Sequence, residues 1–103
     1  MDNKEITEKI NRFIDSIIQE YQPTKIILFG SHAKGTNNEN SDIDIAIVVD
    51  KIEGSFLEKE AQLYKIRRNI DAADIEPILI EQNSDKSGFL DHILSYGKIL
   101  FAR

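Results

Sequence analysis

The sequence predicts an α+β sandwich built around a small sheet, and three observations support this fold class. A long stripe of apolar residues at spacings of three and four opens the chain, which is typical of an amphipathic helix. Two short isoleucine-rich runs follow, each of strand length and bounded by turn-forming residues. The predicted order is helix, strand, strand, helix, strand, helix, strand, which lacks the regular alternation of a doubly wound sheet.

The first two elements lead directly to a tight turn. Apolar residues from Ile6 to Tyr21 lie on one helical stripe, and Pro23 ends that helix. The run 25–29 is rich in isoleucine and stops at Gly30, as expected for a buried strand that enters a turn.

The second predicted strand carries acidic residues only at its start. Residues 35–41 are turn formers without an apolar anchor, so they predict a loop. In the segment that follows, one face is apolar from Ile43 to Val49, whereas the other begins with Asp42 and Asp44. This pattern predicts a central strand whose start opens to a site.

The third predicted helix is expected to begin at a capping box and to run to about Ile70. Ser55 and Glu58 have the spacing of the box. Its apolar face is predicted to comprise Leu57, Ala61, Tyr64 and Ile70. Arg67 and Arg68 are expected on a solvated face and are left out of the site.

The chain is predicted to close with a strand, a helix and a short strand. Residues 75–80 form the first of these, and Pro77 restricts it to an edge, a bulge or a strand start because proline lacks an N–H. Residues from Phe89 to Leu94 predict a helix that ends at Gly97, and residues 98–101 predict a short closing strand.

Composition limits the classes of protein to which the chain can belong. Its 103 residues, of which 41% are hydrophobic and 30% charged, suit one soluble domain, 1–103. Apolar runs are far shorter than the roughly 20 residues that span a bilayer, and the N-terminus lacks an export signal, so a cytoplasmic location without membrane contact is expected. Cysteine is absent, and a net charge of -5 disfavours binding to long nucleic acids.

Two short motifs carry candidate chemistry. Gly30 and Ser31 follow a strand, where the glycine backbone can approach an anion while N–H groups and the hydroxyl donate to phosphate oxygens. Asp42 and Asp44 project from one face with Cα atoms roughly 6.5 to 7 Å apart, within reach of shared magnesium ions. Each motif alone is also typical of an ordinary turn or a solvated strand end, so the prediction rests on their combination.

The combination resembles a known signature. Residues 28–35 (Leu-Phe-Gly-Ser-His-Ala-Lys-Gly) and 41–45 (Ser-Asp-Ile-Asp-Ile) look like the motif of the minimal nucleotidyltransferase family, within the DNA polymerase beta-like superfamily. The resemblance covers nearly the whole chain and implies a small mixed sheet with helices packed mainly on one face. It further implies that Gly30 and Ser31 bind the triphosphate and that Asp42 and Asp44 bind Mg2+.

The resemblance also suggests roles for residues that depart from the family pattern. Glu76 occupies the place of the third carboxylate, often aspartate in relatives, and would bind metal or deprotonate the acceptor hydroxyl. His32 stands where many members have arginine, and Lys34 is an alternative cation for a phosphate.

The leading functional prediction is a nucleotidyltransferase that uses Mg2+ and ATP as donor to place AMP on a hydroxyl of a partner protein. The resemblance implies that this partner is a small helical HEPN-type toxin and that the chain is its antitoxin. Two alternatives remain open: a non-catalytic module that neutralises the HEPN partner by binding, and a small-molecule, aminoglycoside-like nucleotidyltransferase. Relatives of the last kind carry extra domains that hold the acceptor.

Overall fold

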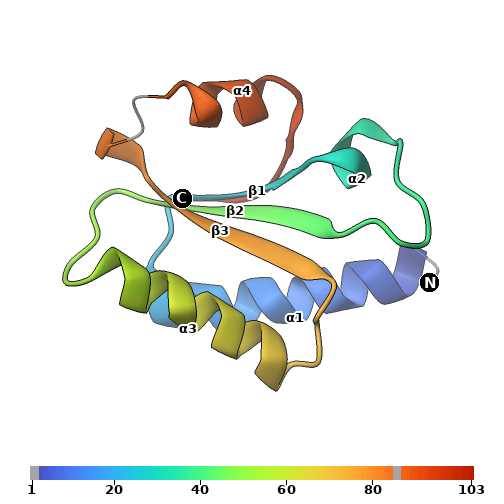
Figure 1. Ribbon diagram of the computed structural model, residues 1–103, viewed down its shortest axis with the longest axis horizontal. Coiled ribbons are helices and arrows are strands. Elements are labelled where there is room, and N and C mark those ends of the chain that lie inside the picture. Colours follow the sequence, from blue (N-terminus) through green and yellow to red (C-terminus); the bar gives the residue numbers. More distant parts are fainter. Residues whose placement is uncertain (1–2, 85–86) are drawn as a thin grey trace.

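A computed structural model describes residues 3–84 and 87–103, which form a four-stranded mixed sheet covered by helices on both faces (Figure 1). In chain order the elements are α1 (Asn3–Tyr21), β1 (Lys25–Phe29), α2 (Ser31–Lys34), β2 (Ile43–Val49), α3 (Phe56–Asn69), β3 (Ile75–Glu81), the 3₁₀ turn η1 (Gln82–Ser84), α4 (Phe89–Tyr96) and β4 (Lys98–Ala102). Within the described residues no helix is both long and apolar enough to cross a bilayer.

The sheet has the order β3-β2-β1-β4 and mixes both strand directions. β1 runs antiparallel to β2 and β4, whereas β2 and β3 are parallel. β2 therefore lies inside the sheet, as its alternation predicts. β3 lies at an edge, where the missing N–H of Pro77 is tolerated.

Alternate residues of β2 supply the two apolar layers. α1 and α3 cover one face and α4 covers the other, so the two longest helices share a face as predicted (Figure 1). The layer beneath α1 and α3 contains Phe13, Ile17, Ile43, Ile45, Ile47 and Leu63, and the layer beneath α4 contains Ala46, Val48, Ile80, Leu90 and Ile93. Each fully buried large side chain contributes roughly 1.5–3 kcal/mol, so both helical layers are anchored through β2.

The predicted apolar face of α3 is wrong for three of its four residues. Leu63 is fully buried against the sheet, with Ile66 and Ile70 packed beside it. Leu57 is 76% exposed and Tyr64 37% exposed, and Ala61 is also exposed.

This error arises because α3 carries apolar residues on two opposite faces. Spacing alone therefore did not decide which face meets the sheet. The start of the helix is as predicted: the Ser55 hydroxyl accepts the Glu58 N–H at 3.3 Å.

Candidate active site

The turn after β1 presses directly against an acidic side chain. Gly30 has φ 72° and ψ -156°, a backbone conformation that is essentially restricted to glycine. A Cβ on Gly30 would overlap the Asp44 carboxylate, with the Asp44 Cγ atom only 3.0 Å away. The absence of a side chain at Gly30 is thus what lets the turn and the carboxylate share this space.

Three acidic residues lie near this turn. The Cα register pairs Asp44 with Phe29 of β1 on one side and with Glu76 of β3 on the other. Paired residues of neighbouring strands project from the same face of a sheet. Asp42 is exposed and lies directly before β2, so the predicted site carboxylates gather at one end of the sheet.

This gathering changes the acidity of Asp44. Burial raises the pKa of its carboxyl group, and the negative charges of Asp42 and Glu76 raise it further, while His32 acts in the opposite direction. Ionisation of Asp44 is therefore less favourable than that of an ordinary, solvent-exposed aspartate. A cation bound between the carboxylates would relieve this repulsion.

The residues fit a magnesium ion that is completed by its substrate. Among residues 3–84 and 87–103, no three acidic or histidine side chains converge closely enough to hold a metal by themselves. Mg2+ is usually held by one or two carboxylates together with substrate phosphates and water, and not by a closed protein cage. Asp42 and Asp44 could supply such a partial set of ligands next to the Gly30 turn.

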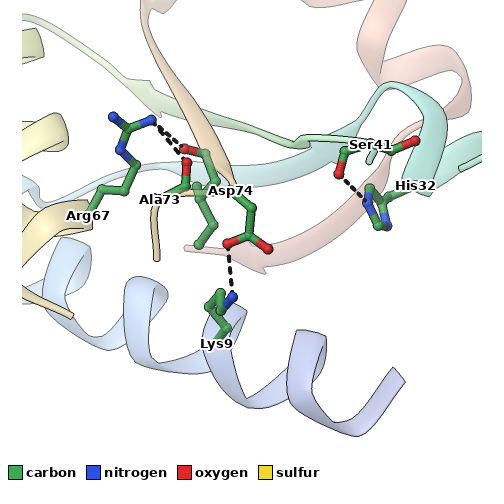
Figure 2. Close-up of polar contacts among 7 residues, drawn as sticks. Lys9, His32, Ser41, Arg67, Ala73 and Asp74 are labelled. Atoms are coloured by element: carbon green, nitrogen blue, oxygen red, sulfur yellow. Dashed lines mark hydrogen bonds and ion pairs between the residues drawn. The ribbon is translucent and has the colours of Figure 1, made fainter. Parts of the chain in front are cut away.

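The loop before Asp42 is ordered by its own hydrogen bonds. The Ser41 hydroxyl accepts the Asn38 N–H at 2.9 Å, and the Asn38 side-chain oxygen accepts the Asn40 N–H at 2.8 Å. The His32 Nε2 atom lies 3.4 Å from the Ser41 carbonyl oxygen, which links α2 to the loop (Figure 2). These contacts fix the approach of the chain to β2.

Comparison with known proteins identifies the family. A model of the family described as polymerase beta, nucleotidyltransferase matches residues 11–103. The chain belongs to this nucleotidyltransferase family.

Two relatives agree with the assignment along most of the chain. A predicted protein adenylyltransferase of Methanocaldococcus jannaschii is 31% identical over 97 residues, which cover 90% of this chain and 93% of the relative. A toxin–antitoxin crystal structure with AMP-PNP contains a chain that is 26% identical, with a TM-score of 0.62 over 88% of this nucleotidyltransferase and 72% of that chain.

A third comparison confirms the predicted polymerase beta-like fold. The crystal structure of a predicted nucleotidyltransferase from Sulfolobus solfataricus has a TM-score of 0.66 and covers 100% of this chain and 91% of its own. Its sequence identity is 18%, so it speaks for the fold alone.

Arg67 of this nucleotidyltransferase does not lie on a solvated face, contrary to expectation. Its Nη1 atom donates to the Ala73 carbonyl oxygen at 3.4 Å (Figure 2) and to the Ile75 carbonyl oxygen at 3.1 Å. The same atom lies 3.4 Å from Glu76 Oε1. Because Arg67 comes from α3 and Glu76 from β3, helical spacing gave no signal of this contact.

The segment that leads into β3 is held from α1 as well. Lys9 forms an ion pair with Asp74 at 2.9 Å (Figure 2), and the Asp74 carbonyl oxygen accepts the Ile43 N–H at 2.8 Å. Two helices thus fix the start of the strand that carries Glu76.

Tyr96, at the end of α4, is a second neighbour of the site that the sequence did not reveal. Its hydroxyl accepts the Gly30 N–H at 2.9 Å across 66 positions of sequence. Separation of this size leaves no periodic or motif signal.

A separate hollow lies away from this site. It measures about 470 Å³ and is lined by residues at the far end of β2, among them Tyr21, Val49, Lys51 and Arg103. The gathered carboxylates and the Gly30 turn, at the start of β2, therefore remain the candidate site.

Proposed function

We propose that this protein is a magnesium-dependent adenylyltransferase that moves AMP from ATP onto a hydroxyl of a partner protein and releases pyrophosphate, as the antitoxin half of a HEPN-type pair. One observation carries the proposal: Asp44 stands in register with Glu76, beside Asp42, and against a turn that only glycine allows. Carboxylates and a phosphate-binding turn at one place are what nucleotidyl transfer requires.

The residues have distinct roles in this mechanism. The Ser31 hydroxyl and the N–H groups that follow Gly30 in the turn would donate hydrogen bonds to oxygens of the triphosphate, while Gly30 itself lets the backbone come close to them. Asp42 and Asp44 would hold Mg2+, which would neutralise negative charge on the oxygens of the α-phosphate and of the departing pyrophosphate. Glu76 would assist as a metal ligand or accept the proton of the attacking hydroxyl.

Little covalent chemistry is asked of the protein. Its contribution is to hold donor and acceptor in line and to supply fixed charges, the two effects that dominate such transfers. Asp44 and Glu76 are suited to this because both belong to hydrogen-bonded strands, which keep their Cα atoms fixed.

A protein acceptor is supported by the comparisons. The 31% identical relative of Methanocaldococcus jannaschii carries the name of a protein adenylyltransferase, and the 26% identical chain comes from a toxin–antitoxin structure with a nucleotide analogue. The gathered carboxylates favour catalysis over a purely neutralising module, because idle like charges at one strand end would destabilise the fold for no benefit.

The test is a transfer assay with labelled ATP, Mg2+ and the product of the neighbouring gene, which the proposal expects to be of HEPN type. We expect a mass increase of one AMP on a partner hydroxyl, lost on addition of EDTA and in Asp42→Ala and Asp44→Ala. Asp50→Ala is the matched control, since Asp50 is an exposed aspartate at the opposite end of the same strand.

Each negative result points to a different alternative. A partner that is bound and inhibited but never modified would establish the neutralising module. A partner that is neither bound nor modified would favour a small-molecule acceptor, provided that the protein binds Mg-ATP. Undiminished Mg-ATP binding by both aspartate variants would refute the assigned metal ligands.

A further inference from the structure

The C-terminal end of α4 makes an unusually close approach to β1. A Cβ on Gly97 would lie 2.8 Å from Ile27 Cγ2 and 2.9 Å from the Leu28 carbonyl oxygen, so only glycine fits between them. The Gly97 N–H also closes the helix by donating to the Ile93 carbonyl oxygen at 2.7 Å. This contact places the preceding residue, Tyr96, at the end of β1 where the Gly30 turn begins.

The Tyr96 hydroxyl satisfies the first amide of that turn. β1 pairs with β2 only as far as Phe29, so the Gly30 N–H lies beyond the paired residues of the sheet. It donates instead to the Tyr96 hydroxyl at 2.9 Å. Because the phenolic oxygen acts as the acceptor here, Tyr96 keeps its own O–H to donate elsewhere.

The ring of the same tyrosine carries a cation at the site. The Lys34 ammonium lies 4.7 Å from the Tyr96 ring centroid, within the range of a cation–π interaction. The His92 ring packs edge to face against the Tyr96 ring, with centroids 5.4 Å apart. Lys34 is the last residue of α2, so a positive charge is held one short helix away from Gly30.

We propose that Tyr96 is a positioning residue of the nucleotide site. Its hydroxyl fixes the Gly30 turn, and its ring holds the Lys34 ammonium, so that the turn and a positive charge face the triphosphate together. The inference rests on the proposed function and deepens it, because it assigns recognition of the phosphate chain to a residue of α4. It predicts that substitutions of Tyr96 weaken binding of the β- and γ-phosphates, which are not part of the transferred AMP.

The experiment compares ligands with and without the phosphate chain. Calorimetric titrations with Mg-ATP, Mg-tripolyphosphate and AMP would be performed on wild type, Tyr96→Phe and Tyr96→Leu. We expect Tyr96→Phe to weaken Mg-ATP and Mg-tripolyphosphate binding by about 2- to 10-fold, the effect of one hydrogen bond, and to leave AMP binding unchanged. Tyr96→Leu should weaken both phosphate ligands further.

Three controls separate positioning from general stability. Tyr64→Phe removes the same hydroxyl group at an exposed position of α3 and should leave all three affinities unchanged. Amide exchange at Gly30 should accelerate in Tyr96→Phe but not in Tyr64→Phe. Lys34→Met should weaken triphosphate binding in wild type and have a smaller effect in Tyr96→Leu, where the ring that holds the ammonium is absent.

The outcomes distinguish this inference from the function on which it rests. If wild type binds Mg-ATP and Tyr96→Phe binds it equally well, the positioning role is refuted while the proposed function stands. Equal losses for AMP and ATP would reassign Tyr96 to general folding and also refute it. A wild-type protein that binds none of the phosphate ligands overturns both.

Discussion

Gly30→Ala tests the close contact on which the candidate site depends. The substitution adds one methyl group at a position with φ 72° and ψ -156°. That methyl group would overlap the Asp44 carboxylate and come within 3.0 Å of its Cγ atom. We expect a protein that still folds but has lost magnesium-dependent nucleotide binding, because Asp44 must rotate away from its place.

Two contributions set the loss in free energy of unfolding that we expect for Gly30→Ala. Holding a residue other than glycine in this backbone region costs about 1–3 kcal/mol. Forcing the Asp44 side chain out of its rotamer adds about 0.5–1.5 kcal/mol, for a total of about 1.5–4.5 kcal/mol. A domain of this size is stable by roughly 5–15 kcal/mol, so the variant remains folded, with Tm lower by about 6–36 °C.

Gly35→Ala provides the matched control. Gly35 also has a positive φ, 75°, but nothing lies within 4 Å of its added Cβ. Its left-handed conformation alone should cost about 1–2 kcal/mol and leave nucleotide binding intact. Urea denaturation and calorimetry with Mg-ATP measure both quantities, and equal losses of stability and affinity in the two variants would refute the argument.

Three further predictions concern the carboxylates. In metal-free protein, Asp44→Asn should be more stable than wild type at neutral pH. Folding raises the pKa of Asp44, so the wild type loses stability as pH rises from the unfolded pKa of 3.8 through the raised folded pKa. Urea midpoints that fall equally with pH in both proteins would contradict this. Glu76→Gln should keep Mg-ATP binding and slow transfer by roughly 10² to 10⁴, measured in single turnover; an unchanged rate would make Glu76 a bystander. Arg67→Met should slow transfer by less than about tenfold, since a partly exposed ion pair is worth about 1 kcal/mol or less, and should have no further effect in Glu76→Gln. An equal slowing in both backgrounds would show that Arg67 does not act through Glu76.

Local sequence patterns predicted most of the fold because hydrophobic residues repeat with the period of a helix or strand, and because proline or glycine marks where an element ends. The stripe from Ile6 to Tyr21 and the alternation from Ile43 to Val49 each identify both the element and its buried side. Pro77 correctly limited its strand to places such as an edge. The family was likewise recognisable because its signature consists of two short segments, 28–35 and 41–45, that lie close together in the sequence.

The remainder depends on contacts between distant elements. The buried face of α3 could not be chosen because Leu57 and Leu63 compete on opposite sides of one helix. Arg67 and Tyr96 reach the site only after α3 and α4 have packed on the sheet. Side-chain packing sets such contacts, and no single-sequence period encodes them.

The two borders of the sheet differ in their capacity to accept another strand. At the β3 border, Pro77 interrupts the row of backbone donors, and Glu76 and Glu81 add negative charge. At the β4 border, no proline intervenes, and Ile99 is 55% exposed. Since proline and charge are devices that block edge-to-edge association, intermolecular sheet extension of this protein is disfavoured at β3 and would proceed through β4.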